Sequence, residues 1–305
     1  MDKMKKSVLA PGLVALIFIL LKVSVHINQD IFTSGESAYL ALILLQLLIF
    51  LFPAILYCKL HSDNFSDHLK IRLLTPDKIP ITVLAALILL FGTAIIKLLL
   101  SYFGVVQESY SLYSYSVPSG DSGFLKGLYV LTVFAVIPAV TEEFVFRGIV
   151  QAEYEDCGIL MSILMPSMLF AMLHFSIRGL PVYLFGGIVL GFTAYITRSL
   201  LSTVIIHIIN NIFSIFIEGY IWDVFAKPEN IIFLVFILLA LFLLFLILFL
   251  SEAERIIYNM GLSNEPSPKG PRSVALWFSE FGRMLISPTF LVCFLIFILS
   301  VCRVI

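Results

Sequence analysis

Long apolar segments recur along the whole chain, separated by shorter polar stretches. Each is close to the roughly 20 residues that a helix needs to cross the hydrocarbon core of a bilayer. Backbone polar groups in lipid must be satisfied within their own segment, so continuously apolar stretches of this length predict helices. The segments lie near residues 8–26, 37–57, 80–103, 124–149, 158–176, 181–197, 200–221, 230–250 and 285–304. We therefore predict an all-α, polytopic transmembrane helix bundle with about 8–9 membrane helices.

The composition supports an integral membrane protein. Of 305 residues, 60% are hydrophobic and 13% are charged, and the mean hydropathy is +1.06. Soluble domains carry roughly a quarter charged residues, so this chain has too little polar surface to face water. The formal net charge of -1 argues against a nucleic-acid partner. The four cysteines have no CxxC spacing and indicate neither a zinc knuckle nor a disulfide framework.

Basic residues set the predicted orientation. Lys3, Lys5 and Lys6 precede the first apolar segment and favour a cytoplasmic N-terminus. No small-x-small cleavage site follows this segment, so we interpret it as a retained span and not as a signal peptide. The loop 104–123 contains neither Lys nor Arg and is expected outside. We therefore predict a multi-pass protein of the cell membrane, which has the lipid bilayer as a partner.

A few charged residues fall inside the apolar segments, where each costs about 2.5 to 3.5 kcal/mol on insertion scales. Lys22, Lys97 and Glu218 lie near the ends of their segments. A long side chain at such a place can reach the interface, so we interpret these three as snorkelling residues without a functional role.

Glu142, Glu143 and Arg147 are different, because they interrupt an apolar run. Glu143 and Arg147 are four residues apart and share a helix face, so an ion pair can lower the cost of burying both. Glu142 lies about 100° away around the helix and is free of that pair. The alternative is that all three mark the cytoplasmic end of the fourth span and are solvated there.

Two of the five histidines lie in apolar segments, and each has a partner four residues away on the same helix face. The pairs are Phe170 with His174 and His207 with Asn211. A lone membrane histidine usually makes a helix–helix hydrogen bond. Histidine, glutamate, arginine and asparagine side chains on successive spans instead predict an intramembrane polar cavity.

The sixth apolar segment carries Gly187 and Gly191 at a small-xxx-small spacing, which lets helices approach closely. We interpret this spacing as a packing device. It would draw the sixth helix against its neighbours and so hold the helices that carry the polar cluster in place.

The cluster is equipped to hydrolyse an amide. An unpaired carboxylate in a poorly hydrated pocket suits a general base, the role we predict for Glu142. His174 can fix the attacking water, and Asn211 with His207 can donate to a developing oxyanion. No Ser, Thr or Cys lies beside a base in a comparable setting, which disfavours a covalent nucleophile.

Zinc is the open alternative, because two histidines and a carboxylate form a ligand set of zinc hydrolases. The ligands would be Glu142, His174 and His207. The HExxH motif, in which one helix supplies both histidines, is absent. The sequence leaves the choice between zinc and a metal-free site open.

The three motifs EExxxR, FxxxH and HxxxN, in this order on successive polar-cluster helices of the chain, resemble the CPBP intramembrane protease family. This family comprises the type II CAAX prenyl endopeptidases and the bacterial Abi proteins linked to bacteriocin processing and self-immunity. The resemblance covers about residues 131–216. The residues that carry it are Glu142, Glu143, Arg147, Phe170, His174, His207 and Asn211.

The resemblance implies a helix bundle whose cavity opens toward the cytoplasm. The match to Glu142 activates water together with the match to His174, while His207 and Asn211 match oxyanion-stabilising positions. Glu143, Arg147 and Phe170 match supporting positions. Both metal-dependent and metal-free glutamate mechanisms are held for the family, and the residues present favour the metal-free one.

The expected organisation has three parts: N-terminal membrane helices over 1–123, a catalytic core over 124–222, and C-terminal membrane helices with a cytoplasmic linker over 223–305. The expected function is an endopeptidase that cleaves membrane-anchored proteins or hydrophobic peptides. A non-catalytic bacteriocin-immunity or scaffold protein of the same fold is the alternative. A proton-coupled transporter is disfavoured, because neither an internal repeat nor a pair of broken helices is evident.

The position of His174 is hard to reconcile with straight helices. A helix rises about 1.5 Å per residue, so a straight fifth span would carry His174 far past Glu142. Three features could correct this: residues 151–160 lying at the interface, a recessed loop at 176–181, or a kink at Pro166.

Overall fold

The computed structural model describes residues 2–26, 35–61, 74–105, 123–219, 231–262 and 274–303, and these ranges contain helices but no strand. Five helices within them are long and apolar enough to cross a membrane: Tyr39–Leu60, Pro76–Tyr102, Gly127–Cys157, Leu180–Thr197 and Phe233–Met260. Four shorter apolar helices cover Leu9–Ser24, Ile159–Leu173, Leu200–Phe216 and Pro288–Val301. Each of the predicted apolar segments corresponds to one of these helices, so the all-α polytopic bundle is confirmed.

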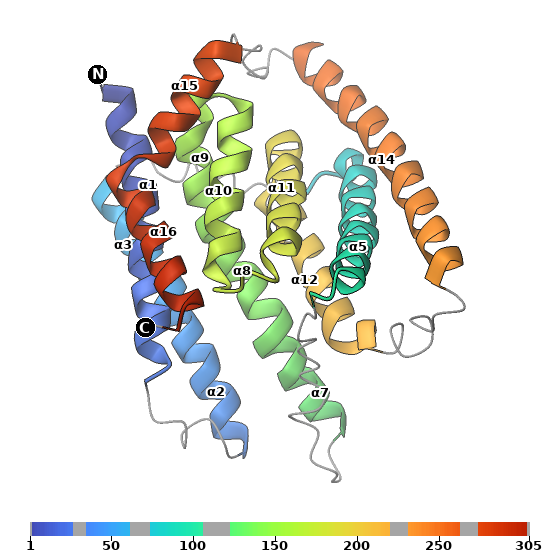
Figure 1. Ribbon diagram of the computed structural model, residues 1–305, viewed down its shortest axis with the longest axis horizontal. Coiled ribbons are helices and arrows are strands. Elements are labelled where there is room, and N and C mark those ends of the chain that lie inside the picture. Colours follow the sequence, from blue (N-terminus) through green and yellow to red (C-terminus); the bar gives the residue numbers. More distant parts are fainter. Residues whose placement is uncertain are drawn as a thin grey trace.

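The helices that build the bundle are named as in Figure 1. The first half of the chain contains α1 (Asp2–Ser24), α2 (Gly35–Gln46), η2 (Leu47–Leu51), α3 (Phe52–His61), η3 (Pro76–Lys78) and α5 (Ile79–Tyr102). One continuous helical stretch follows, formed by α7 (Gly123–Leu131), η4 (Thr132–Val136), α8 (Ile137–Glu143), η5 (Phe144–Val150), α9 (Gln151–Tyr154) and η6 (Glu155–Cys157). The remainder is α10 (Ile159–Leu173), α11 (Leu180–Thr197), α12 (Leu200–Phe216), α14 (Ile231–Leu262), α15 (Val274–Leu285) and α16 (Pro288–Val301).

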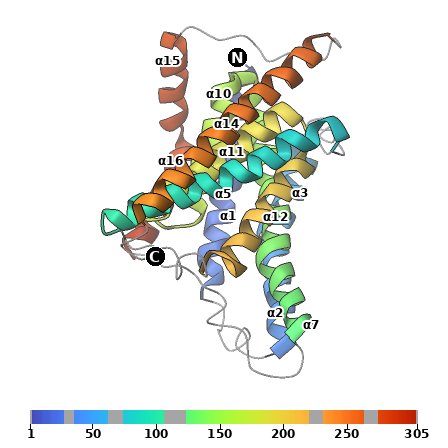
Figure 2. The same cartoon turned by 90° about the vertical axis from the view of Figure 1, so that its right-hand side faces the viewer.

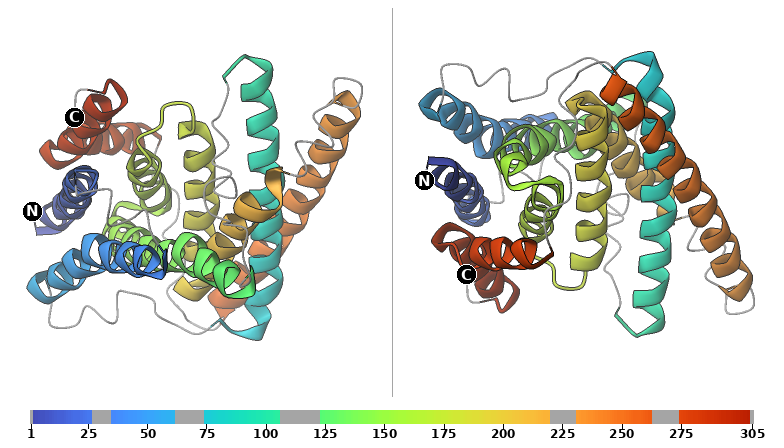
Figure 3. Two further views of the ribbon diagram at one scale, coloured as in Figure 1. Left: turned by 90° about the horizontal axis from the view of Figure 1, so that it is seen from below. Right: turned by 90° about the horizontal axis from the view of Figure 1, so that it is seen from above.

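Helices α10 and α11 lie in the middle of the bundle (Figure 1). On one side α1 packs against α16 and α3, and on the other side α5 packs against α11, α12 and α14. Helices α5 and α14 cross the bundle obliquely, side by side (Figure 2). Seen from above and below, α14 forms one edge of the bundle, whereas α1 and α16 lie toward the opposite edge (Figure 3).

Two apolar cores hold these helices together. The first joins α1, η2, α3, η5, α10 and α16, and the second joins α5, α11, α12 and α14. Most of the buried polar side chains come from the stretch between α8 and α12. The polar part of the interior is therefore concentrated in the region where the sequence predicts the cluster.

The fourth helix is longer than predicted: it continues to Cys157 instead of ending near 149. Two polar side chains beyond residue 149 have hydrogen-bond partners inside the protein. Gln151 donates to the Gly191 carbonyl, and Glu153 accepts a hydrogen bond from Tyr57. The helix can therefore continue through residues that would be costly in lipid.

Other boundaries also differ from the prediction. Helix α14 continues to Leu262, past the expected end at 250, while α12 ends at Phe216 and not at 221. The last apolar helix was expected to begin near 285. Residue 285 belongs to α15, and the last apolar helix, α16, begins at Pro288. The expected outer loop lies largely outside the described residues, as does the centre of the expected cytoplasmic linker. The membrane side of each loop stays a prediction.

Three short segments, η2, η4 and η5, are π-helical. A π-turn widens the hydrogen-bond ladder from i→i+4 to i→i+5, and such turns in α-helices occur frequently at functional sites. Segment η4 lies before Glu142, and η5 begins directly after Glu143. The two π-segments therefore flank the carboxylates of the first motif.

Candidate active site

The three motifs meet near the middle of the long helix that runs from α7 to η6. The chain reverses after Cys157, and Glu142 and His174 lie at similar distances along the sequence from this reversal. They therefore reach similar heights in antiparallel helices, and α10 packs against η5, the segment that begins directly after Glu143 (Figure 1). The difficulty with His174 disappears because the fourth helix is longer than predicted.

The recessed loop is the one of the three expected corrections that the structure contains. Helix α10 begins at Ile159, so an interfacial segment does not delay it, and it remains helical through Pro166. The connection from α10 to α11 lies near mid-height in the bundle (Figure 1). His174 thus stands at the inner end of a short helix.

Glu143 is the centre of a buried charge network. Arg147 Nη1 donates to Glu143 Oε1 over 2.9 Å, and Nδ1 of His207 approaches the same oxygen at 2.9 Å. The side chains of Glu143 and Arg147 are 0% and 1% exposed, and Thr203 also lies beside this carboxylate. The predicted ion pair is confirmed. The alternative that these residues are solvated at a helix end is wrong.

Glu142 lacks the pairs that Glu143 makes. It is buried, and within the described residues its Oε2 has no hydrogen-bond partner, which is also true of Glu143 Oε2. His207 and Arg147 are close enough to Glu142 to interact with it electrostatically, but both are bonded to Glu143 Oε1. One of the two neighbouring carboxylates is therefore held in ion pairs, while the other makes none among the described residues.

The imidazole of His174 has a defined tautomer. Its Nδ1 lies 3.0 Å from the carbonyl oxygen of Phe170, and a carbonyl can only accept. Nδ1 therefore carries the hydrogen, and in the neutral ring Nε2 keeps its lone pair. The ring also stacks on Tyr183, with 3.6 Å between centroids and 13° between planes.

Phe170 lies in contact with all three motifs. Its ring makes edge contacts with His174 at 5.1 Å and with His207 at 5.8 Å between centroids. The Arg147 guanidinium lies 4.6 Å from the ring centroid, a cation–π distance. The phenylalanine of the second motif thus positions the arginine and both histidines against one another.

Asn211 reaches the first π-segment. Its Nδ2 donates to the carbonyl oxygen of Ala135 in η4 over 3.4 Å. An amide nitrogen carries two hydrogens, so one remains for another acceptor. The third motif is thus hydrogen-bonded to the π-segment η4 through a backbone carbonyl. No sequence motif indicates this contact.

The predicted packing role of the glycines is supported by the geometry. An added Cβ at Gly187 would lie 2.9 Å from the backbone of Ser167 on α10. The glycine carbonyls also accept from the fourth helix: Arg147 donates to Gly187 over 3.2 Å, and Gln151 donates to Gly191 over 2.8 Å. Gln151 is absent from the predicted site, although its spacing of four from Arg147 places it on the same helix face.

The zinc alternative can be tested against the arrangement of donors. Among the residues that the structure describes, no three His, Cys, Asp or Glu side chains are grouped so that they could hold a metal ion. The expected ligands Glu142, His174 and His207 therefore do not form a ready ligand set. His207 is instead bonded to Glu143 through Nδ1.

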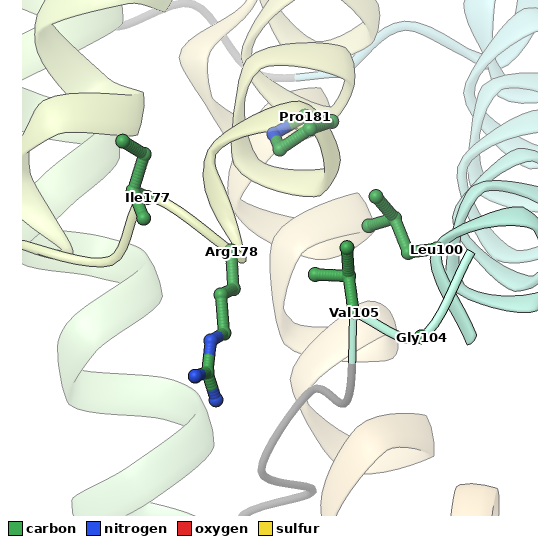
Figure 4. Close-up of a pocket in the computed structure, with 6 residues that line it drawn as sticks. All are labelled: Leu100, Gly104, Val105, Ile177, Arg178 and Pro181. Carbon is green, nitrogen blue, oxygen red and sulfur yellow. The ribbon is translucent and has the colours of Figure 1, made fainter.

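A cavity of about 420 Å³ lies beside the connection that follows His174. It is lined by Leu100, Gly104, Val105, Ile177, Arg178 and Pro181 (Figure 4). Four of these side chains are aliphatic or proline, and Arg178 is the one charged group among them. Aliphatic side chains, proline, glycine and a single cation thus line the cavity, and the cation is four residues along the chain from His174.

The snorkelling interpretation of Lys97 and Glu218 is wrong. The two side chains form an ion pair between α5 and the end of α12, and Ser214 also donates to Glu218. Lys22 lies 5.0 Å from the ring centroid of Phe175. These charges are satisfied inside the protein, and sequence distances of more than a hundred residues concealed the pairing.

Comparison with family models gives a match for the motif region. Residues 124–213 match the model described as type II CAAX prenyl endopeptidase Rce1-like. This region is therefore similar to that family. No curated protein and no solved structure matches the chain. The resemblance predicted from the three motifs is confirmed.

The Rce1-like region contains every motif residue of the cluster, from Glu142 to Asn211. Its family description supports a protease in general terms and, together with the apolar helices, an integral membrane protein. The predicted division into three parts is a separate matter and stays a prediction.

Proposed function

We propose that this protein is an intramembrane endopeptidase in which Glu142 activates the attacking water. The observation that carries the proposal is the contrast between two adjacent buried carboxylates. Glu143 is paired with Arg147 and His207 through Oε1, whereas Glu142 makes no ion pair among the described residues and its Oε2 has no hydrogen-bond partner there. A general base needs such an available lone pair.

His174 complements Glu142 because both offer acceptors. A water molecule has two hydrogens, of which one can go to the Glu142 carboxylate and the other to Nε2 of His174. The bond from Nδ1 to Phe170 favours the tautomer in which Nε2 is free to accept. The water oxygen then adds to the peptide carbonyl carbon as Glu142 takes its proton.

His207 and Asn211 suit the developing oxyanion. The Glu143 carboxylate orients the His207 ring through Nδ1, as the aspartate of a catalytic triad does. The oxyanion accepts from the second hydrogen on Asn211 Nδ2 and, when His207 carries a hydrogen on both ring nitrogens, from its Nε2. When the C–N bond breaks, Glu142 returns its proton to the leaving amine.

The cavity beside the connection that follows His174 suggests the substrate class. Its aliphatic lining residues can contact hydrophobic side chains, and a guanidinium recognises a carboxylate through charge-assisted hydrogen bonds. We propose that the substrates are hydrophobic or membrane-anchored peptides whose free C-terminus lies near Arg178. This fits the description of the matched family, whose members are CAAX prenyl endopeptidases.

The steps above use only the side chains of this protein. A zinc-dependent reaction is the competing proposal, and it requires Glu142, His174 and His207 to move into a ligand set. It also requires His207 to act through Nε2, since Nδ1 is bonded to Glu143.

The test is cleavage of a quenched membrane-peptide library by detergent-purified protein, with and without a chelator. Glu142→Ala and His174→Ala should abolish cleavage. Glu254→Ala, on an exposed part of α14, is the matched control and should cleave like the wild type. Chelator-resistant cleavage supports the metal-free reaction, and chelator-sensitive cleavage supports zinc. A wild type that cleaves nothing would favour an immunity or scaffold protein of the same fold.

A further inference from the structure

The turn after His174 brings together aromatic contacts that have no part in the proposed reaction. The imidazole lies between two aromatic rings: Phe170 meets it edge-on at 5.1 Å, and Tyr183 stacks on it at 3.6 Å with the planes 13° apart. Tyr183 is on α11, which begins after the turn, so the turn brings its ring back over the histidine.

Phe175 shapes the first half of this turn. Its φ of 47° is one of the few positive values at a residue other than glycine in the described ranges. Such a conformation is strained, and it persists where surrounding contacts hold it. Phe18 meets the Phe175 ring edge-on at 5.3 Å, and Lys22 lies 5.0 Å above it. Helix α1 thus anchors the residue that directly follows His174.

Gly179 shapes the second half. An added Cβ at this position would lie 2.5 Å from Cε2 of Tyr183, a separation that real side chains do not adopt. The Gly179 N–H donates to Ser176 Oγ over 3.0 Å, which fixes the turn in front of α11. Because Gly179 has no side chain, the Tyr183 ring can occupy this space.

We propose that Tyr183 is a positioning residue for His174. The stacked ring holds the imidazole plane, while the Phe170 carbonyl holds the hydrogen on Nδ1, so that Nε2 faces the water beside Glu142 in one tautomer. Without the stack the imidazole can rotate about its χ2 bond and lose the Phe170 hydrogen bond. The inference rests on the proposed function for its effect on catalysis, but the orientation of His174 can be measured separately.

The test compares Tyr183→Leu with Tyr183→Phe, which keeps the stacking ring. Tyr195→Leu removes a tyrosine from the same helix, away from His174, and serves as the matched control. Tyr183→Leu should lower kcat about 10- to 100-fold at constant KM, as expected for a misplaced catalytic group. Tyr183→Phe and Tyr195→Leu should keep the wild-type kcat.

The second measurement is independent of activity. In ¹⁵N-histidine spectra, assigned with His174→Gln, the wild type and Tyr183→Phe should show His174 as one Nδ1–H tautomer. Tyr183→Leu should show a tautomer mixture, and so should Gly179→Ala, which displaces the Tyr183 ring without removing it. An unchanged His174 signal in Tyr183→Leu would overturn the inference, even if the protein proves to have no peptidase activity. A tautomer mixture in Tyr183→Leu, found together with a wild type that cleaves nothing, would support the positioning role and reject only the proposed function.

Discussion

The interface between η5–α9 and α11 and the interface between α5 and α14 are built on opposite principles. In the first, Arg147 and Gln151 donate to the backbone carbonyls of α11. In the second the ring contacts are apolar, such as the stack of Phe91 on Phe245 at 5.5 Å between centroids. Lipid tails are as apolar as these rings. Burying the rings between α5 and α14 therefore costs little free energy and gives little specificity to the pairing of the two helices.

The difference indicates at which interface the protein keeps buried polar groups in spite of their desolvation cost. A buried charge needs a full set of partners, and a well-packed apolar replacement is often as stable. Polar groups kept in a membrane interior therefore point to function. Helix α14 has none of these groups in its apolar stretch, and only 6% of that stretch is buried. We interpret the first interface as the catalytic frame and α14 as its support.

The largest expected loss of stability comes from breaking the charge network. Arg147→Met leaves the buried Glu143 without its main counter-charge, which should cost about 3–5 kcal/mol in unfolding free energy. Thermal unfolding in detergent measures this. The double variant Arg147→Met with Glu143→Gln should lose less than the two single losses added together, because the residues are coupled. An additive loss would mean that the pair contributes nothing as a pair.

The next effect concerns the glycine contact between α10 and α11. Gly187→Ala places a Cβ 2.9 Å from the Ser167 backbone and should cost about 1–3 kcal/mol, the range for overpacking. Gly186→Ala is the matched control, since its Cβ meets Leu89 at an ordinary 3.5 Å. Equal unfolding temperatures for the two variants would show that the close approach is not needed.

A smaller effect is expected in the cavity. Arg178→Gln removes the one cation and should raise KM about tenfold, or about 1.4 kcal/mol, for peptides with a free C-terminal carboxylate. The KM for the same peptides amidated at the C-terminus should not change. Arg283→Gln, on the exposed part of α15, controls for loss of charge alone. An equal rise in KM for both peptide forms would reject carboxylate recognition.

The smallest effect is expected on the outer face of α14. Phe236 is 68% exposed, so Phe236→Ala should change the unfolding free energy by less than about 0.5 kcal/mol, as surface substitutions usually do. Thermal unfolding and peptide cleavage are the two measurements. A loss as large as that of Gly187→Ala would mean that α14 is part of the catalytic frame, and the contrast between the two interfaces would fail.

The bundle and its polar centre could be predicted because both depend on local quantities. The length of an apolar run predicts a span, and the cost of a charge in lipid singles out Glu142, Glu143 and Arg147. Helical periodicity was enough to pair Glu143 with Arg147 and to separate Glu142 from them.

The remaining features depend on residues far apart in the sequence. The fourth helix passes 149 because Gln151 is satisfied by α11 and Glu153 by Tyr57, neither of which is a neighbour in sequence. Lys97 finds Glu218 in the same way. Tyr183 carries no signal of its own, because its importance comes from a turn that only the folded chain defines.

Glu142 and Glu143 are adjacent, but we assign them different roles. The most direct test is to measure peptide cleavage and thermal unfolding for Glu142→Gln and Glu143→Gln side by side. Glu142→Gln should lose about 10²- to 10⁴-fold in cleavage rate, the usual contribution of a general base, and unfold at the wild-type temperature. Glu143→Gln should unfold at a lower temperature, because Arg147 loses its counter-charge. Cleavage by Glu142→Gln at the wild-type rate would contradict the account.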